Sequence, residues 1–308
     1  MRQTCLNMVY ELAKQDPRVV FVGSDLGVGT LKQFKAEMPD RYYMEGVSEQ
    51  NIIGMAAGLA MEGKVVYFNT IATFITRRCF EQVVIDLCLH NVPVRLIGSG
   101  GGMVYAPLGP THLAIEDIAI FRAVPNMAIV APADANEMRR FMPQSLNHPG
   151  PLYIRLGKGG DPIVTPDDQQ FAVGKTYGLR EGKDAVLVTT GVTAKTALDA
   201  AASLAQQGID AGVLHVPTVK PLDAEAVLKR VAAVPVVVTI EEHTLMGGLG
   251  SAVAELIAET GFTPAKRFKR LGLPDVFPDQ YGSQASLMER YDLTPAHVAK
   301  VVQQLHTR

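Results

Sequence analysis

The stretch EGVSEQNIIGMAAGLAMEGK, residues 45–64, has the features of a helix that packs closely against another backbone. Ser48 stands at the expected N-cap, and Glu49 follows in the first turn, where the helix dipole favours a carboxylate. Because the helix is apolar nearly all round, we expect it to be buried, at an interface between subunits. From this pattern alone, Glu49 could equally be the capping residue of a core helix. The small residues that permit close approach are Gly54, Ala56, Ala57, Gly58 and Ala60.

Short apolar, β-branched runs alternate with helical patterns around this stretch. Such runs are typical of strands that are buried on both faces of a parallel sheet. The alternation therefore predicts a parallel sheet with helices on both faces. The last helix should begin with a capping box, Asp134 followed by Glu137. The predicted strands are 19–24, 65–70, 92–99, 127–132 and 151–156, and the predicted helices are 48–62, 77–90, 113–123 and 134–147.

A segment without periodicity, 157–174, divides the chain. Its sequence GKGGDPIVTPDDQQ is rich in Gly, Pro and Asp and is typical of a linker. We therefore predict an α/β protein of two open parallel-sheet domains with helices on both faces, at residues 1–165 and 176–308. In the second domain the predicted strands are 184–191, 210–216, 234–240 and 267–271, and the predicted helices are 193–207, 223–233, 249–260 and 295–305.

Composition argues against several functional classes. The 308 residues carry a formal net charge of −2, so no basic field would hold nucleic acid or an anionic membrane. No stretch approaches the length of an uncharged apolar span, so we expect no membrane segment. Three cysteines without metal-ligand spacing fit a reducing cytoplasm. Charged residues make up 19% of the chain, a low share that suggests a surface covered by a partner.

Two further stretches place chemically useful side chains after strands. The stretch NTIATFITRRCFEQ, 69–82, puts Phe74 in a loop after a strand. A glycine-rich loop, 99–112, ends in Gly-Pro-Thr-His, so that His112 lies at the carboxyl end of a strand, where open α/β sheets bind ligands. Each signal is weak by itself. A lone Phe is more often core, a loop His is more often structural, and three glycines without a Walker lysine make a poor phosphate loop.

Together, in this order and spacing, these stretches resemble the transketolase family over almost the whole chain. The resemblance implies a domain that binds the pyrimidine of thiamine diphosphate, followed by the carboxyl-terminal domain of the family. It also implies an enzyme that transfers a two-carbon ketol unit between sugars or sugar phosphates. The matching motifs are the Glu-Gln-Asn helix start at 49–51, Thr-x-x-x-Phe at 70–74, Gly-Pro-Thr-His at 109–112, Pro-Asn…Pro-Ala-Asp…Glu at 125–137 and Gly-Pro-Leu-Tyr-Ile-Arg at 150–155.

One family motif is missing. Thiamine-diphosphate enzymes hold the diphosphate through a metal with Gly-Asp-Gly and a later Asn, whereas the nearest string here, Gly-Gly-Asp-Pro at 159–162, lies in the linker. The resemblance therefore implies that a separate amino-terminal, diphosphate-binding subunit holds the Mg²⁺. The chain should be active only with that partner, in a heterotetramer built on a self-associating dimer core. We predict no metal site at the Glu-Glu-His run 241–243, because adjacent strand residues do not face one point.

The resemblance assigns roles to particular residues. Glu49 matches the carboxyl group that hydrogen-bonds the distal pyrimidine nitrogen and so acts in catalysis. Phe74 matches the aromatic that stacks on the pyrimidine, and Asp25 matches an acidic residue near the cofactor. His112 matches the substrate-side histidine that binds sugar oxygens or moves protons, and Arg155 matches a phosphate-binding arginine. Arg155 could instead form a surface ion pair, and Asp25 could be a turn former.

Other positions depart from ordinary sugar-phosphate transketolases. Leu108 stands where an acidic residue usually reads donor hydroxyls, and Ile71 and Arg77 replace aromatic residues. A modified or less usual sugar donor is therefore plausible. Three alternatives stay open: the beta subunit of a 2-oxoacid dehydrogenase first component, a fragment resembling 1-deoxyxylulose-5-phosphate synthase, and a scaffold that binds no cofactor. The Gly-Pro-Thr-His and Thr-Arg-Arg motifs favour transketolase, and Glu49 argues against the scaffold.

Overall fold

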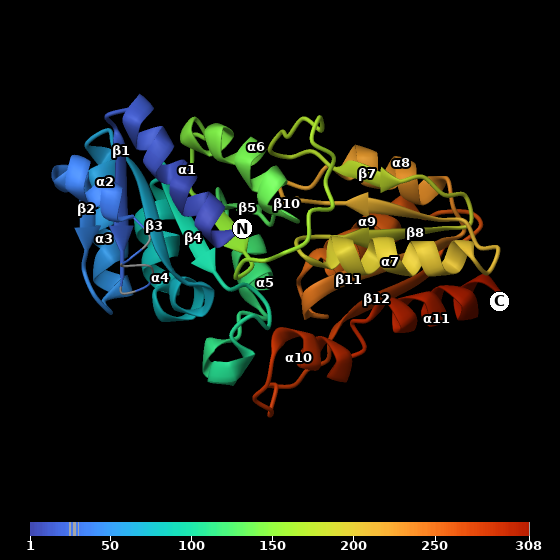
Figure 1. Cartoon of the computed structure of the whole chain (residues 1–308). Helices are drawn as coiled ribbons and strands as arrows, with labels where there is room; N and C mark the ends of the chain where they lie inside the picture. Colours follow the sequence, from blue (N-terminus) through green and yellow to red (C-terminus); the bar gives the residue numbers. More distant parts are fainter. Residues whose placement is uncertain (25, 27–28, 30, 308) are drawn as a thin grey trace.

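The first half of the chain is built around a twisted sheet with strand order β10-β5-β6-β4-β3-β1-β2 (Figure 1). The computed structural model describes residues 1–24, 26, 29 and 31–307. Within them, neighbouring strands of this sheet are parallel, except that β10 is antiparallel to β5. The strands are β1 (Val19–Gly23), β2 (Tyr42–Met44), β3 (Val65–Ile71), β4 (Val94–Ser99), β5 (Ala128–Val130), β6 (Leu152–Leu156) and β10 (Thr218–Lys220).

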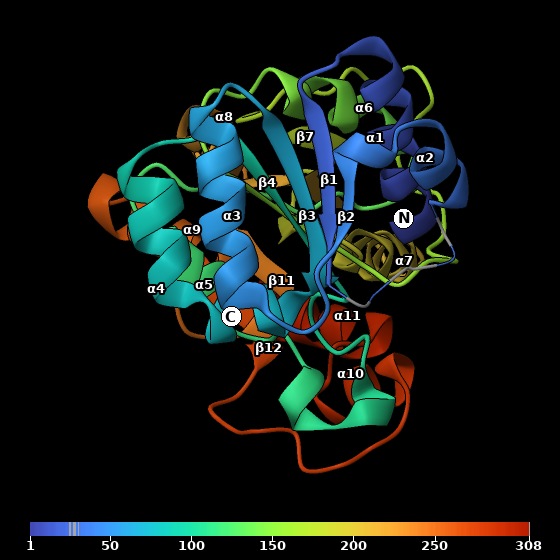
Figure 2. The same cartoon turned by 90° about the vertical axis from the view of Figure 1, so that its left-hand side faces the viewer.

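Helices cover both faces of this sheet, as the view down the first half shows (Figure 2). One face packs against α1 (Arg2–Gln15), α2 (Lys32–Glu37) and α6 (Ala135–Leu146), whose apolar side chains share a core with β1. The other face packs against α3 (Glu49–Met61) and α5 (Asp117–Arg122), with a helical segment at 74–89 beside them. The predicted α/β fold with helices on both faces is confirmed.

Two predicted helices differ in detail. The segment predicted as 77–90 is helical but largely of the π type, at Phe74–Arg78 and Val83–Leu89, with the short α4 (Phe80–Gln82) between. The predicted helix 113–123 was too long at its start, because α5 begins at Asp117 and the preceding residues pair with the glycine-rich loop instead. Short 3₁₀ turns, Pro39–Arg41, Ala106–Leu108 and Pro110–His112, complete the first half.

The second half forms its own sheet, in order β12-β11-β8-β9-β7, parallel except for the antiparallel edge strand β7. Helices again lie on both faces, α7, α10 and α11 on one and α8 and α9 on the other. The elements are β7 (Tyr177–Arg180), β8 (Ala185–Thr189), α7 (Thr193–Ala205), β9 (Ala211–His215), α8 (Ala224–Ala232), β11 (Val236–Thr244), α9 (Leu249–Thr260), β12 (Arg267–Leu273), α10 (Gln284–Arg290) and α11 (Pro295–His306).

The two halves exchange elements. Strand β10, from the second half, extends the first sheet beyond β5. In return, the loop that follows β4 sends apolar side chains into the core of the second half, beside α7 and β8. These side chains are Met103, Ala106, Leu113 and Ile115. The loop that carries His112 is therefore anchored on both sides by the second core, while Leu108 and Thr111 at its tip are exposed.

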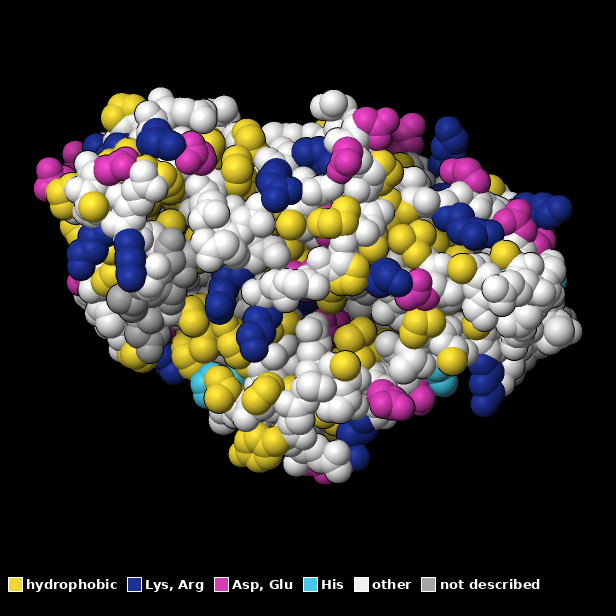
Figure 3. Space-filling model, in the orientation of Figure 1, with side chains coloured by type: hydrophobic (Ala, Val, Ile, Leu, Met, Phe, Trp, Pro, Cys, Tyr) yellow, Lys and Arg dark blue, Asp and Glu magenta, His cyan; other side chains and the backbone are white. Residues whose placement is uncertain are grey.

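The surface carries charges of both signs. Lys and Arg side chains are interspersed with Asp and Glu over the face seen in Figure 3, and no broad basic area stands out there. None of the helices in the described part of the chain has the length and apolar character needed to cross a bilayer.

Candidate active site

Glu49 is the first residue of α3 and is completely buried. Both of its carboxylate oxygens have partners. Thr70, at the carboxyl end of β3, donates to Oε1 at 3.2 Å, and Arg78 donates from Nη1 to Oε2 at 2.7 Å. Ser48 is the N-cap residue, as predicted, but its hydroxyl donates to the carbonyl of Glu45 and accepts no hydrogen bond from the first turn of the helix. Glu49 thus lies at the carboxyl edge of the sheet, where open α/β sheets bind ligands.

Phe74 begins the π-helical segment and is half-buried. The guanidinium carbon of Arg78 lies 4.0 Å from the centroid of its ring, close enough for a cation–π contact. Arg78 therefore stacks on Phe74 and pairs with Glu49 at once. Sequence reasoning did not assign a role to Arg78, although the Thr-Arg-Arg motif contained it.

His112 lies beside this pair. Its ring meets Phe74 edge to face, with 5.3 Å between the ring centroids. The Nδ1 atom is 2.9 Å from the hydroxyl of Thr111, and the side chain is only half-buried. The structure thus brings together three of the predicted site residues: Glu49 at the start of α3, Phe74 at the start of the π-helical segment, and His112 at the end of a 3₁₀ turn.

Arg77 fixes the loop that presents His112. Its guanidinium forms a two-point ion pair with Glu116, with Nη2 to Oε2 at 2.9 Å, and it also donates to the carbonyl of Leu113 at 2.9 Å. Adjacent arginines therefore serve different partners, Arg78 the buried carboxylate and Arg77 the His112 loop. An extra residue per turn in a π-helical segment changes which side chains share a face, and such segments are frequent at functional sites.

Hydroxyl and amide groups line the strand ends beneath Glu49. Ser24 donates to Thr70 at 2.8 Å, and Thr70 in turn donates to Glu49. Ser99, at the end of β4, donates to the amide oxygen of Asn69 at 2.9 Å. These buried bonds hold the ends of three strands in register. Asp25, predicted to lie near the cofactor, falls outside the residues that the structure describes.

Cys79 follows Arg78 but is no nucleophile in this arrangement. Burial, with the Glu49 charge adding, raises the pKa of its thiol to about 12. The thiol donates to the carbonyl of Ile75 at 3.0 Å. A thiol so placed stays protonated near neutral pH and is structural.

Arg155 does not join Glu49, Phe74 and His112 in the site. It is buried between the two halves, where Nε donates to Asp117 Oδ2 at 2.7 Å. Its Nη2 donates to the carbonyls of Ala114 and Glu242, at 3.1 and 2.9 Å. Burial opposes the charged form, but the adjoining Asp117 carboxylate outweighs it and raises the pKa of Arg155. With Nε and Nη2 directed at protein acceptors and the side chain buried, this placement does not support the phosphate-binding role that the resemblance implied, nor the alternative of a surface ion pair.

The glycine-rich loop is a close contact between the two halves. A Cβ atom at each of the three glycines, 100–102, would lie 2.1 to 2.6 Å from the side chains of Tyr105, Arg155 and Glu242 in turn. Only glycine, which has no Cβ atom, therefore fits at these three positions without displacing a neighbouring side chain. This packing, with positive φ at Gly100 and Gly102, is sufficient to account for the Gly-Gly-Gly run.

Glu242 holds that loop from the second half. Its carboxylate accepts from the amide of Met103 at 2.6 Å and from the side-chain amide of Gln284 at 2.9 Å. Burial raises the pKa of Glu242 to about 7, against the lowering effect of the Arg155 charge. Sequence reasoning missed this residue because its partners lie far away in the chain.

The neighbours of Glu242 have structural partners of their own. Glu241 accepts from the amides of Leu249 and Gly250, at 2.7 and 2.8 Å, at the start of α9. His243 Nε2 accepts from the amide of Ala119 at 3.2 Å. Among the residues that the structure describes, no group of three His, Cys, Asp or Glu side chains is arranged to hold a metal ion.

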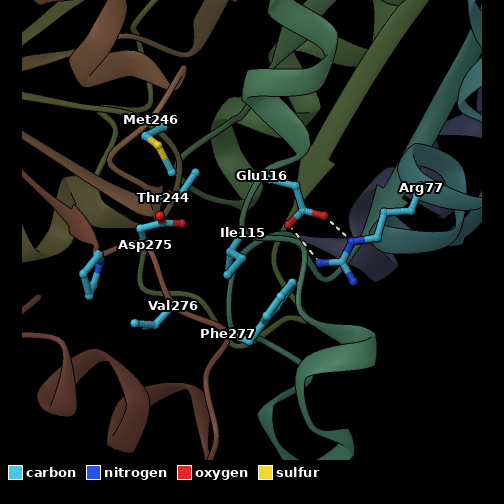
Figure 4. Close-up of a pocket in the computed structure, with 9 residues that line it drawn as sticks. Arg77, Ile115, Glu116, Thr244, Met246, Asp275, Val276 and Phe277 are labelled. Carbon is cyan, nitrogen blue, oxygen red and sulfur yellow. Dashed lines mark hydrogen bonds and ion pairs between the residues drawn. The ribbon is translucent and has the colours of Figure 1, made fainter.

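A cavity of about 390 Å³ opens beside the His112 loop (Figure 4). The Arg77–Glu116 pair closes one side, and Phe277 and Val276 lie across from it on a loop of the second half. Glu49, Phe74 and His112 do not line this cavity. We therefore place the candidate active site at the buried carboxylate, whose chemistry is more specific than that of a largely apolar hollow.

Comparisons with known proteins agree with this geometry. Residues 1–160 match the family described as transketolase, pyrimidine binding domain, and residues 174–298 match transketolase, C-terminal domain. A solved structure described as split gene transketolase, inactive beta4 tetramer, superposes with a TM-score of 0.91 at 36% identity, and the match covers 99% of this chain and 98% of that one.

Two curated relatives span the chain. The 6-deoxy-6-sulfo-D-fructose transketolase subunit SqwH of Clostridium sp. (strain MSTE9) is 37% identical over 309 residues, 100% of this chain and 95% of that subunit. The 1-deoxy-D-xylulose-5-phosphate synthase of Symbiobacterium thermophilum is 40% identical over 305 residues, which are 98% of this chain but only 46% of that protein.

Proposed function

The chain belongs to the transketolase family, and we propose that it is the pyrimidine-binding subunit of a thiamine-diphosphate-dependent transketolase. A separate chain would supply the diphosphate-binding half. The complex would transfer a two-carbon ketol unit between sugar or sugar-phosphate substrates. Relatives of similar length and full coverage, one named as a transketolase subunit and one described as a split gene transketolase, support this division.

The observation that carries the proposal is the position of the Arg78 guanidinium. A flat group with N–H donors stacks on Phe74 and hydrogen-bonds Glu49 at the same time. The site therefore accepts a planar, nitrogen-bearing ring between an aromatic face and a buried carboxyl group. An aminopyrimidine has that shape and that pattern of polar atoms, so the residues fit thiamine diphosphate.

Each residue then has a defined task. Glu49 would hydrogen-bond a ring nitrogen and hold a proton there, Phe74 would fix the ring plane, and Asp25 would lie near the cofactor. His112, half-exposed beside Phe74, would orient a sugar oxygen or exchange a proton with it. The bound cofactor supplies the nucleophilic carbon that takes up the ketol unit, and the protein orients it. With Leu108 exposed near the site and no acidic residue in its place, an unusual sugar donor is favoured.

The partner would bind where α3 faces solvent. On that face Gly58 has nothing within 4 Å of an added Cβ, and Gly54 meets only Asp86, at 4.0 Å. Met61 is 54% exposed beside them. Another helix could pack closely against such a surface. We propose that this face joins either a second copy or the diphosphate-binding subunit, in a heterotetramer with Mg²⁺ on the partner.

The thiols support a cytoplasmic location. Cys5, Cys79 and Cys88 are free and buried, and no disulfide joins them. Proteins of oxidising compartments more often pair their cysteines. We therefore place the complex in the cytoplasm.

Calorimetric titration with thiamine diphosphate and Mg²⁺ tests whether this chain needs the diphosphate-binding subunit to hold the cofactor. One stacked ring contributes about 0.5–1.5 kcal/mol beyond burial, and a hydrogen bond about 1 kcal/mol. Micromolar binding needs about 8 kcal/mol, so the chain alone should show no tight binding. Adding the diphosphate-binding subunit, sought first in the neighbouring gene, should produce both binding and ketol transfer.

Two results would overturn this proposal. Tight stoichiometric binding by the chain alone would show that it holds the diphosphate itself. Formation of 1-deoxy-D-xylulose 5-phosphate by the complex, without ketol transfer, would favour the synthase activity of the other relative.

A further inference from the structure

Arg78 extends from the surface into the buried site. Its side chain is 38% exposed, whereas the carboxylate that it contacts is 0% exposed. Among the described residues, its contacts in the site are the Glu49 oxygen at 2.7 Å and the Phe74 ring at 4.0 Å. These are the two contacts that the proposed function gives to the aminopyrimidine, so a pyrimidine at the same carboxylate oxygen and ring face competes with the guanidinium for them.

We infer that Arg78 is a placeholder for the pyrimidine: it occupies the ring position in the cofactor-free chain and moves out when the cofactor binds. This inference rests on the proposed function. A completely buried carboxylate without a partner is strongly unfavourable, and the guanidinium neutralises it until the cofactor arrives. The exposed stem of an arginine allows the head group to swing back into water while the stem stays on the surface.

The neighbouring arginine shows why only one of the two can move. Arg77 is bound to Glu116 through two hydrogen bonds and also holds the carbonyl of Leu113, so it is part of the loop that positions His112. Arg78 has no such bond to a loop carbonyl within the described residues. Arg77 thus holds the His112 loop in place, whereas Arg78 makes contacts that a bound cofactor can replace.

A thermodynamic cycle gives the sign of the effect. Contacts that Arg78 makes only in the free state stabilise that state and so weaken cofactor binding. Removing them should strengthen binding by the same factor. If Arg78 instead kept its contacts in the bound state, or touched the cofactor, its removal would leave the affinity unchanged or reduce it.

The test measures the dissociation constant of thiamine diphosphate, with Mg²⁺, for the complex of this chain with its diphosphate-binding partner. Arg78→Gln should bind about 3- to 30-fold more tightly than the wild type, the range expected for losing a cation–π and ion-pair contact. Arg78→Lys keeps the charge but loses the planar group that stacks on Phe74. Its dissociation constant should lie between those of the wild type and Arg78→Gln. Arg139→Gln removes an exposed charge from α6 and should leave the affinity unchanged.

Thermal unfolding gives a second readout that needs no activity. Arg78→Gln should lower the melting temperature of the cofactor-free chain but not that of the saturated complex. Equal or weaker cofactor binding by Arg78→Gln, with normal binding by the wild type, would overturn the placeholder role alone. Absence of binding in the wild-type complex would overturn the proposed function together with it.

Discussion

At the scale of single residues, the active site depends on how one buried charge is satisfied. Glu49 receives a hydrogen bond from Thr70 on the strand side and one from Arg78 on the outer side. The first belongs to the fixed frame of the sheet, and the second comes from a side chain that reaches solvent. The carboxyl group is therefore rigidly placed while one of its oxygens can change partners.

Glu49→Gln should lower ketol transfer by the complex about 10²- to 10⁴-fold, the usual effect of losing an acid–base partner. The amide has nearly the same volume but cannot share a proton with a ring nitrogen, so the fold should persist. Initial rates at saturating cofactor provide the measurement. The matched control is Glu62→Gln, an exposed carboxylate at the end of the same helix, which should keep full activity. Normal turnover by the Glu49 variant would remove its catalytic role.

Arg155→Met should destabilise the chain by about 3–5 kcal/mol, because it leaves the buried Asp117 carboxylate unpaired. Urea unfolding measures this change. The exposed Lys195–Asp199 pair offers a control, since Lys195→Met should cost at most about 0.5 kcal/mol.

The Arg155 variant should not discriminate between sugars. If it folds, kcat/KM for a phosphorylated sugar and for its unphosphorylated analogue should change by the same factor. A selective rise in KM for the phosphorylated sugar would instead restore the phosphate-binding role.

At the scale of elements, the π-helical segment Phe74–Arg78 organises the site. It presents an aromatic face, the placeholder Arg78 and the loop anchor Arg77 within five residues. A regular α-helix starting at the same point would give these side chains other directions. The departure from regular geometry is therefore part of what assembles the site.

Arg77→Gln should loosen the His112 loop with little loss of global stability. The ion pair with Glu116 is partly exposed, so the free energy of unfolding should fall by no more than about 1 kcal/mol. A misplaced His112 should nevertheless lower kcat about 10- to 100-fold. Hydrogen exchange of amides 111–116 should accelerate in parallel.

Glu116→Gln removes the other partner of the same ion pair. If Arg77 and Glu116 position the loop only through their ion pair, kcat of the double variant should be no lower than kcat of either single variant. Additive losses, or unchanged exchange in the loop, would show that Arg77 acts in another way.

At the scale of the whole molecule, the carboxyl-terminal half helps to build the candidate active site of the amino-terminal half. The loop that ends in His112 packs its apolar side chains into the second core, and Glu242 accepts from the amide of Met103 in that loop. The position of His112 therefore depends on both sheets. A chain cut at the linker would lose this support.

The raised pKa of Glu242 makes the stability of the folded chain dependent on pH. Burial raises the pKa from 4.5 to about 7, so between these values the folded chain keeps a proton that the unfolded chain releases. This contribution to stability is full below about pH 4.5 and is lost as pH rises to 7, a change of roughly 3 kcal/mol. The groups facing the carboxylate are Arg155, Asp117, Gln284 and the Met103 amide.

Glu242→Gln should abolish that dependence. Relative to the wild type, the free energy of unfolding of the variant should increase steadily between pH 5 and 7 and then level off. Urea titrations at pH 5, 6, 7 and 8 give the comparison. Parallel curves for the two proteins would contradict a carboxyl group that titrates inside the fold.

The sequence by itself determined the alternation of strands and helices and the grouping of Glu49, Phe74 and His112. Phe74 and His112 each follow a predicted strand of one parallel sheet, and the carboxyl ends of such strands meet at one edge. Glu49 was grouped with them by the family resemblance, because strand β2, which precedes it, was not predicted from the sequence. The missing Gly-Asp-Gly motif was likewise visible without any structure, and it pointed to a partner subunit.

Only the tertiary structure decided which arginine lies in the site. Arg155 lies near the carboxyl end of strand β6, where a ligand-binding residue could stand, yet Asp117 and the carbonyl of Glu242 hold it between the two halves. Arg78 gained its role because a π-helical segment turned it toward Glu49. Strand β10 and the loop before His112 each joined the other half of the molecule. These outcomes depend on partners distant in the chain, and hydrophobic periodicity carries no information about such partners.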